Sequence, residues 1–120
     1  MGAKAMDMDE KLQAIFQSFH AKVVRHLADM AGALGRAGAP GDDAARKVAL
    51  QALEGQAHKM AGTAGTFGLA GLTAPARALE EACRRINEQG RPPLSEEHTA
   101  LGQALELLRQ AYAQEKVPTP

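Results

Sequence analysis

The sequence predicts an all-α protein that folds as an antiparallel up-down-up-down four-helix bundle. Apolar residues recur at intervals of three and four in four separate segments, as they do along one face of a helix. No segment alternates apolar and polar residues over a useful length, so a β-sheet is not expected. Short connections separate the segments, and short connections make consecutive helices antiparallel. The apolar residues are 45% of the chain and aromatic residues only 3%, a composition typical of packed helices.

The first two predicted helices lie on either side of a break at residues 35–43, "GRAGAPGDD". Glycine and proline interrupt helices, and Asp42 suits the N-cap of the second helix. That second helix ends at a turn near residues 68–71. The first helix is expected to bury Leu12, Ile15, Phe16, Phe19, Val23, Leu27, Met30 and Leu34. The second is expected to bury Leu53, Ala57, Met60, Ala64 and Phe67.

The last two predicted helices are separated by residues 87–93, "NEQGRPP". The third begins between Leu69 and Thr73, and Pro75 is tolerated if it lies in the first turn, where its missing N–H matters least. Ser95 is expected to be the N-cap of the fourth, because two glutamates follow it in the first turn. The third helix is expected to bury Leu72, Ala76, Leu79, Cys83 and Ile86. The fourth is expected to bury Leu101, Ala104, Leu105, Leu108, Ala111 and Tyr112.

Length and composition predict one domain and exclude several classes of function. We expect a domain at residues 9–116, preceded by a frayed leader at residues 1–8. The chain has 14 basic and 14 acidic residues, and a net charge of zero argues against nucleic-acid binding. The single Cys83 excludes an internal disulfide and a multi-cysteine zinc site. No apolar run has the length of a signal peptide or a membrane span, so we expect a cytoplasmic protein without a membrane partner.

One stretch of the second helix, "AHKMAGTAGTFG" at residues 57–68, carries a histidine among glycines. With Met60 set at zero on the helical wheel, Leu53, Ala57, Ala64 and Phe67 lie within about 60° of it, and His58 lies roughly 140° from the centre of this stripe. Gly55, Gly62 and Gly65 lie on this outer side too, so they do not serve packing inside the core. Because glycine has no side chain, the surface around the exposed imidazole stays open, and a partner backbone or a phosphoryl group can approach closely. The alternative is an ordinary solvated surface histidine.

The sequence "AHKMAGTAGTFGLAGLTAPARALEEA" resembles the core motif of histidine-containing phosphotransfer (HPt) domains, as found in phosphorelays and chemotaxis kinases. The family pattern runs roughly H-x-[LIM]-[KR]-G-x-[AS]-x-x-x-G, followed by a Leu-Glu pair in the third helix. This chain matches at His58, Met60, Gly62, Ala64 and Gly68, and again at Leu79 and Glu80. The resemblance implies a four-helix phosphocarrier that is phosphorylated on His58.

The resemblance also implies supporting residues around His58. Glu80 is the candidate that accepts a hydrogen bond from Nδ1–H and leaves Nε2 as the nucleophile, although the adjacent Glu81 is not distinguished from it. The family usually has a basic residue three positions after the histidine, where this chain has Ala61. Lys59 is the candidate replacement, and an ordinary solvated lysine is the equal alternative.

The partners implied by the resemblance are receiver domains of response regulators and sensor or hybrid histidine kinases. The carrier is expected to be a monomer with no cofactor of its own, because the receiver domain supplies Mg²⁺. It is expected to have no autonomous kinase activity, because the sequence contains no ATP-binding domain. Gly55, Gly62 and Gly65 are expected to lie in the docking face. Two alternatives remain: a helical-bundle interaction module that never carries phosphate, and a small enzyme with His58 as general base. For the enzyme, the sequence offers no cofactor motif and no evident oxyanion donors.

Overall fold

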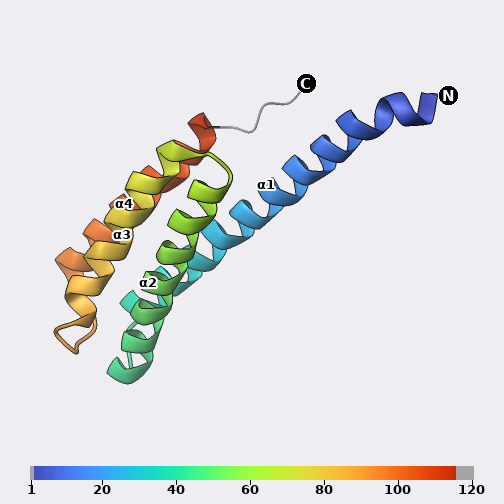
Figure 1. The fold of residues 1–120 in the computed structure, drawn as a ribbon. Helices are drawn as coiled ribbons and strands as arrows, with labels where there is room; N and C mark the ends of the chain where they lie inside the picture. The colour runs from blue at the N-terminus through green and yellow to red at the C-terminus, as the bar shows by residue number, and fades with distance from the viewer. Residues whose placement is uncertain (1, 116–120) are drawn as a thin grey trace.

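The computed structural model describes the backbone of residues 2–115 and the side chains of residues 8–115. It contains four helices and, over the described residues, no strand. In Figure 1 the chain descends along α1, rises along α2, descends along α3 and rises along α4. The predicted all-α, up-down-up-down four-helix bundle is therefore confirmed. The helices are α1 (Gly2–Gly38), α2 (Asp43–Thr66), α3 (Ala70–Asn87) and α4 (Ser95–Gln114).

The core of the bundle consists almost entirely of aliphatic side chains from all four helices. α2 packs against α1 and α3, and α4 completes the bundle against α3 and α1. Each large apolar side chain removed from water contributes about 1.5–3 kcal/mol, so this cluster supplies the main stabilising term. The largest fully buried side chains are Met30, Leu50, Leu53, Met60, Leu72, Leu79, Leu101, Leu108, Val23 and Cys83.

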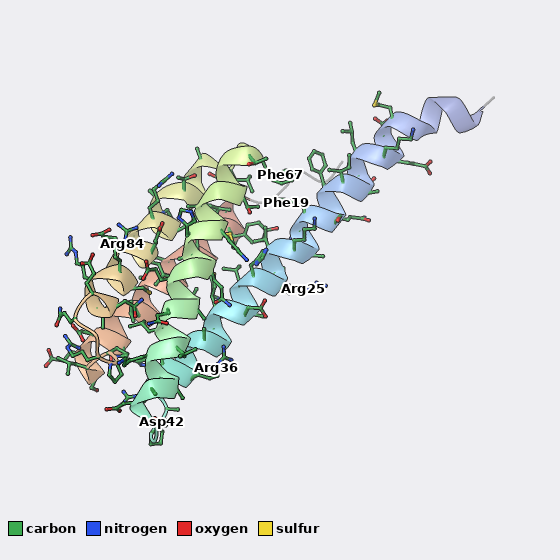
Figure 2. All side chains as sticks on the ribbon, turned by 60° about the horizontal axis from the view of Figure 1, so that its bottom comes forward. Phe19, Arg25, Arg36, Asp42, Phe67 and Arg84 are labelled. Atoms are coloured by element: carbon green, nitrogen blue, oxygen red, sulfur yellow. The ribbon has the colours of Figure 1, made fainter. Side chains whose placement is uncertain are left out.

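The N-terminal half of α1 extends beyond the bundle, which corrects one prediction. Leu12, Ile15 and Phe16 were expected in the core, but they are 44%, 53% and 39% exposed. The burial of α1 begins at Phe19, because α1 has 37 residues and the helix beside it, α2, has only 24. The first turns of α1 consequently have no neighbouring helix to pack against (Figures 1 and 2).

The predicted domain boundaries extend past the described part of the chain. α1 begins at Gly2, so the backbone of residues 2–8 is helical in the structure. Residues 1 and 116 lie outside the described residues. The frayed leader at residues 1–8 and the domain at residues 9–116 therefore stay predictions.

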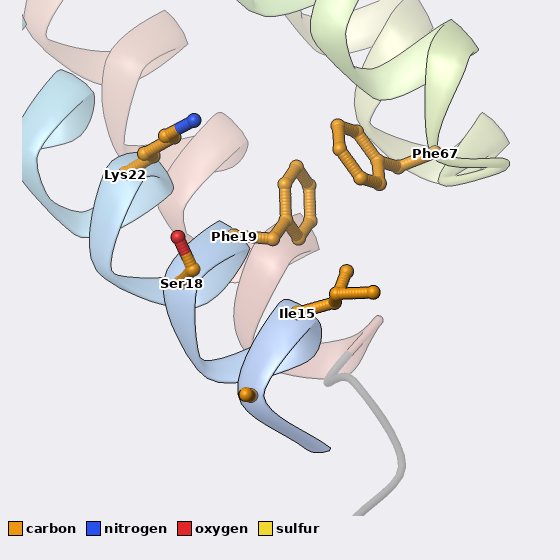
Figure 3. A pocket seen from close by; sticks show the side chains of 6 residues that line it. Ile15, Ser18, Phe19, Lys22 and Phe67 are labelled. Carbon is orange, nitrogen blue, oxygen red and sulfur yellow. The ribbon is translucent and has the colours of Figure 1, made fainter. Parts of the chain in front are cut away.

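Phe67 is also less buried than predicted. It is the C-cap of α2 and is 48% exposed. Its ring stacks on that of Phe19, with the ring centroids 4.1 Å apart. Figure 3 shows the two rings facing each other beside Ile15, Ser18 and Lys22 of α1. The stack closes the upper end of the core and lines a shallow cavity of about 280 Å³.

Two helix starts were predicted with different accuracy. The prediction for Asp42 is confirmed, since its Oδ1 accepts a hydrogen bond from the backbone N–H of Ala44 at 3.0 Å. The prediction for Ser95 is wrong by one residue, because Leu94 is the N-cap of α4. The backbone N–H of Leu94 donates to Glu97 Oε1 at 2.8 Å. The Glu97 side chain thus satisfies the backbone N–H of the N-cap residue, whereas the leucine side chain provides no capping hydrogen bond to the first turn.

The turn from α2 to α3 places the third helix beside the second. Gly68 has φ of +71°, a left-handed conformation that favours glycine. The backbone N–H of Leu69 donates to the carbonyl of Ala64 at 2.8 Å and closes the turn. α3 then starts at Ala70, within the predicted range, and Pro75 falls in its second turn rather than its first. The helix continues through Pro75, so only the carbonyl of Gly71 loses its usual partner.

Candidate functional site

His58 lies on the outer side of α2, as the helical wheel predicts. Its side chain is 73% exposed, whereas Ala57, Met60 and Ala64 are almost completely buried. The imidazole therefore stands on the surface while its helix is anchored in the core. Such an arrangement holds the ring on a rigid support and leaves it open to a partner.

The three glycines around His58 form an open surface. Gly55, Gly62 and Gly65 are all exposed, and a Cβ added to any of them would meet nothing within 4 Å. Nothing inside the protein requires glycine at these positions, although glycine costs about 1 kcal/mol in a helix interior. The missing side chains leave flat backbone on both sides of the imidazole.

Glu80 binds the imidazole from the neighbouring helix. Its Oε2 lies 2.9 Å from Nδ1 of His58, and the residue is only 7% exposed. The carboxylate can only accept, so in the neutral imidazole Nδ1 carries the proton and donates a hydrogen bond to Glu80. Nε2 is then unprotonated and directed away from Glu80. Glu81, which the sequence could not distinguish from Glu80, instead forms ion pairs with Arg84 and Arg85.

Arg84 joins this site and was missed by the sequence analysis. Its Nη2 lies 3.0 Å from Oε2 of Glu80, the same oxygen that faces His58. Its Nη1 lies 2.8 Å from Glu81, and its Nε lies 3.8 Å from Glu54 of α2. The available signal was spacing, because Arg84 follows Glu80 by four residues, the distance at which helical side chains meet. Arg84 is labelled on α3 in Figure 2.

Ala61 and Lys59, the family position of the basic residue and its candidate replacement, differ in their surroundings. Ala61, where the family usually has Lys or Arg, is only 4% exposed. Lys59 is exposed, and it forms no ion pair with any of the described side chains 8–115. The structure does not bring Lys59 to Glu80, because successive residues on a helix are turned by about 100°. Compensation by Lys59 stays a prediction.

Below the surface, Cys83 lies close to the same acidic groups. It is completely buried, and burial together with Glu54 and Glu80 raises the pKa of its thiol to about 12. A thiol with such a pKa keeps its proton at neutral pH and is neither a nucleophile nor a metal ligand. Within residues 8–115, no group of three His, Cys, Asp or Glu side chains is arranged to hold a metal ion.

The other three histidines of the chain lie in different surroundings. Nδ1 of His20 hydrogen-bonds to the hydroxyl of Tyr112. Nε2 of His98 hydrogen-bonds to the carbonyl of Leu34 at 2.8 Å. His26 is half-buried on α1. Among the side chains of residues 8–115, none of these three histidines has a buried carboxylate partner of the kind that Glu80 provides to His58.

The described helices contain no stretch that is both long and apolar enough to cross a membrane.

Comparison with known proteins identifies the family of the chain. The family model described as Hpt domain matches residues 14–111, which is more than half of the chain. No curated protein and no solved structure matches it. The match includes α2, α3 and most of α1 and α4, together with His58 and Glu80. The chain therefore belongs to the Hpt domain family, whose members take part in phosphotransfer between histidine and aspartate.

Proposed function

We propose that this protein is a phosphocarrier that accepts a phosphoryl group on His58 and passes it to an aspartate of a receiver domain. The donor is the aspartyl phosphate of another receiver domain or a histidine kinase. The observation that carries the proposal is the pairing of an exposed imidazole with a buried carboxylate at its Nδ1, 2.9 Å apart. This pairing fixes the tautomer in which Nε2 has a free lone pair.

The chemistry follows from this tautomer. Nε2 of His58 attacks phosphorus in line, and the P–O bond to the donor carboxylate breaks as the N–P bond forms. The electron pair of the broken bond stays on the donor carboxylate. Nδ1 keeps its proton, so positive charge develops on the ring during the attack, and Glu80 stabilises that charge. Onward transfer is the reverse reaction with a second receiver aspartate.

The partner supplies what the carrier lacks. We propose that Mg²⁺ is bound by the receiver domain, and that this chain has neither a cofactor nor kinase activity of its own. The carrier acts as a monomer in the cytoplasm. Its contribution to catalysis is the position and protonation state of one imidazole.

The docking face is the surface of α2 around His58. Gly55, Gly62 and Gly65 leave room there for a partner to approach the imidazole. Ile15 and Phe67 also expose apolar area. Phe67 follows His58 by nine residues, so at about 100° per residue it lies on the opposite side of α2 and belongs to a separate surface.

A specific observation favours a second candidate, a helical-bundle interaction module. The exposed apolar residues at the start of α1 are suited to binding a protein whether or not phosphate is transferred. In that case His58 lies in the binding surface without reacting, and the lack of a basic residue at Ala61 has no consequence.

Transfer to a receiver domain distinguishes the two functions. The protein is loaded with phosphoramidate, freed of the reagent, and mixed with a panel of purified receiver domains in the presence of Mg²⁺. We expect the phosphoryl group to move to at least one receiver, and not to its Asp→Asn variant. A His58→Gln protein that supports the same receiver phosphorylation would overturn the proposal. Receivers that bind wild type and His58→Gln equally, without transfer, would favour the interaction module.

A further inference from the structure

Two groups share one oxygen of Glu80. Oε2 accepts from Nδ1 of His58 at 2.9 Å and from Nη2 of Arg84 at 3.0 Å. Because the Glu80 side chain is only 9% exposed, water reaches little of this carboxylate. The orientation of the carboxylate is therefore determined by its hydrogen bonds to His58 and Arg84.

The buried carboxylate of Glu80 needs a counter-charge that His58 cannot supply. Removing an ionised carboxylate from water is strongly unfavourable unless an opposite charge accompanies it. His58 must be neutral to act as a nucleophile, so its imidazole contributes only a hydrogen bond. The guanidinium of Arg84 is always protonated and provides the permanent positive charge.

Arg84 is itself held from two helices. Its Nη1 binds Glu81 on α3 at 2.8 Å, and its Nε lies 3.8 Å from Oε2 of Glu54 on α2. Glu54 is fixed in turn by the side-chain amide of Asn87, which donates to Oε1 at 2.7 Å. The planar guanidinium therefore has one orientation in which all three of its nitrogen atoms face carboxylates.

We propose that Arg84 is a positioning residue that supplies the counter-charge of the buried Glu80 carboxylate and keeps it directed at Nδ1 of His58. It thereby maintains the tautomer in which Nε2 attacks phosphorus. This inference rests on the proposed phosphocarrier function. Arg84 acts through Glu80 and not on the phosphoryl group, because its Nη2 is bound on the Nδ1 side of the ring.

The first test compares Arg84→Gln, which removes the charge, with Arg84→Lys, which keeps it. Arg85→Gln is the matched control, because Arg85 is a neighbouring arginine that lies 3.4 Å from Glu81 and has a 75% exposed side chain. Phosphorylation of His58 by phosphoramidate is followed by intact mass, and the protonation of its two ring nitrogens by ¹⁵N NMR. We expect Arg84→Gln to slow phosphorylation about tenfold and to mix the two tautomers, as loss of a group that orients a ligand does elsewhere. Arg84→Lys should restore most of the rate.

A double-mutant cycle with Glu80→Gln tests whether Arg84 acts through Glu80. The two Glu80→Gln proteins leave no buried carboxylate at this position, so the test for direct action on the phosphoryl group can be made even if Arg84→Gln alone fails to fold. We expect Glu80→Gln and Glu80→Gln/Arg84→Gln to react equally fast. A further loss of rate in the double variant would overturn the proposal, because Arg84 would then act on the phosphoryl group directly.

The two proposals fail in different ways. Wild-type protein that takes no phosphoryl group on His58 would contradict the phosphocarrier function. The NMR measurement would still report the effect of Arg84 on the tautomer. Equal rates and equal tautomers in wild type and Arg84→Gln would contradict only the role of Arg84.

Discussion

At the scale of single residues, the site depends on the contrast between an exposed base and a buried acid. His58 is 73% exposed at its side chain and Glu80 only 9%. The exposure of His58 could be predicted, because the geometry of one helix determines which residues lie opposite its apolar stripe. The choice between Glu80 and Glu81 could not, because it depends on how α3 is rotated against α2. The spacing of four residues already places Arg84 beside Glu80, but its approach to Glu54 of α2 depends on the same rotation.

The role of Glu80 predicts a kinetic defect without a structural one. Glu80→Ala should slow phosphoryl transfer to His58 by about tenfold or more, because Nδ1 loses its acceptor and the ring its stabilising charge. The helical circular dichroism spectrum should not change. Glu106→Ala is the control, since Glu106 lies on α4 and pairs with Arg109, away from the imidazole. Unchanged kinetics in Glu80→Ala would remove Glu80 from the mechanism.

The raised pKa of the Cys83 thiol predicts how the free energy of unfolding depends on pH. Burial, with Glu54 and Glu80 nearby, raises the pKa of its thiol from 9.0 to about 12 in the folded protein. Above pH 9 the unfolded chain loses this proton while the folded protein keeps it, so stability decreases as pH rises. The contribution is about 1.4 kcal/mol per pH unit between these two pKa values.

The measurement for Cys83 is the free energy of unfolding in urea at several pH values. Cys83→Ala is compared with wild type, because other groups also titrate in this range and the difference isolates the thiol. Wild type should lose stability faster than Cys83→Ala above pH 9. Parallel curves for the two proteins would show that the thiol ionises equally easily in both states.

At the scale of helices, periodicity predicts which face is apolar but not how much of it is covered. The spacing of Leu12, Ile15 and Phe16 continues that of Phe19 and Val23 without interruption. Only the second pair is buried, because α1 is longer than the helix it packs against. The lengths of the partner helices, and not the residues of α1, decide where burial begins.

A substitution in the glycine surface of α2 should impair docking of the receiver domain without changing the reactivity of His58. Gly62→Gln should leave phosphorylation by the small donor phosphoramidate unchanged, because nothing in the protein lies within 4 Å of the new Cβ. Transfer from His58 to a receiver domain should become slower, because the side chain enters the space left for the partner. Gly35→Gln on α1 is the control, since its Cβ also meets nothing within 4 Å.

Both substitutions replace glycine in a helix, so neither should destabilise the protein. A slower transfer in Gly62→Gln therefore cannot result from unfolding, which thermal denaturation monitored by circular dichroism verifies. Transfer as fast as in Gly35→Gln would show that the receiver does not approach over Gly62.

At the scale of the whole molecule, the order and direction of the helices could be predicted, but the register between them could not. Four apolar segments with short connections allow few arrangements other than an antiparallel bundle. The position of α3 along α2 depends on the turn at Gly68 and on core packing, and this register brings Glu80 to His58. The individual helices could therefore be located in the sequence, whereas the site formed between two of them required the structure.

The most direct test of the account is to identify which histidine reacts with phosphoramidate. The chain has four histidines, so His20, His26 and His98 are internal controls in the same sample. Intact mass and peptide mapping of wild type and His58→Gln are compared, with acid lability as the mark of phosphohistidine. We expect one acid-labile phosphoryl group on His58 that is absent from His58→Gln. Phosphorylation of the other histidines while His58 stays unmodified would contradict it and favour the interaction module.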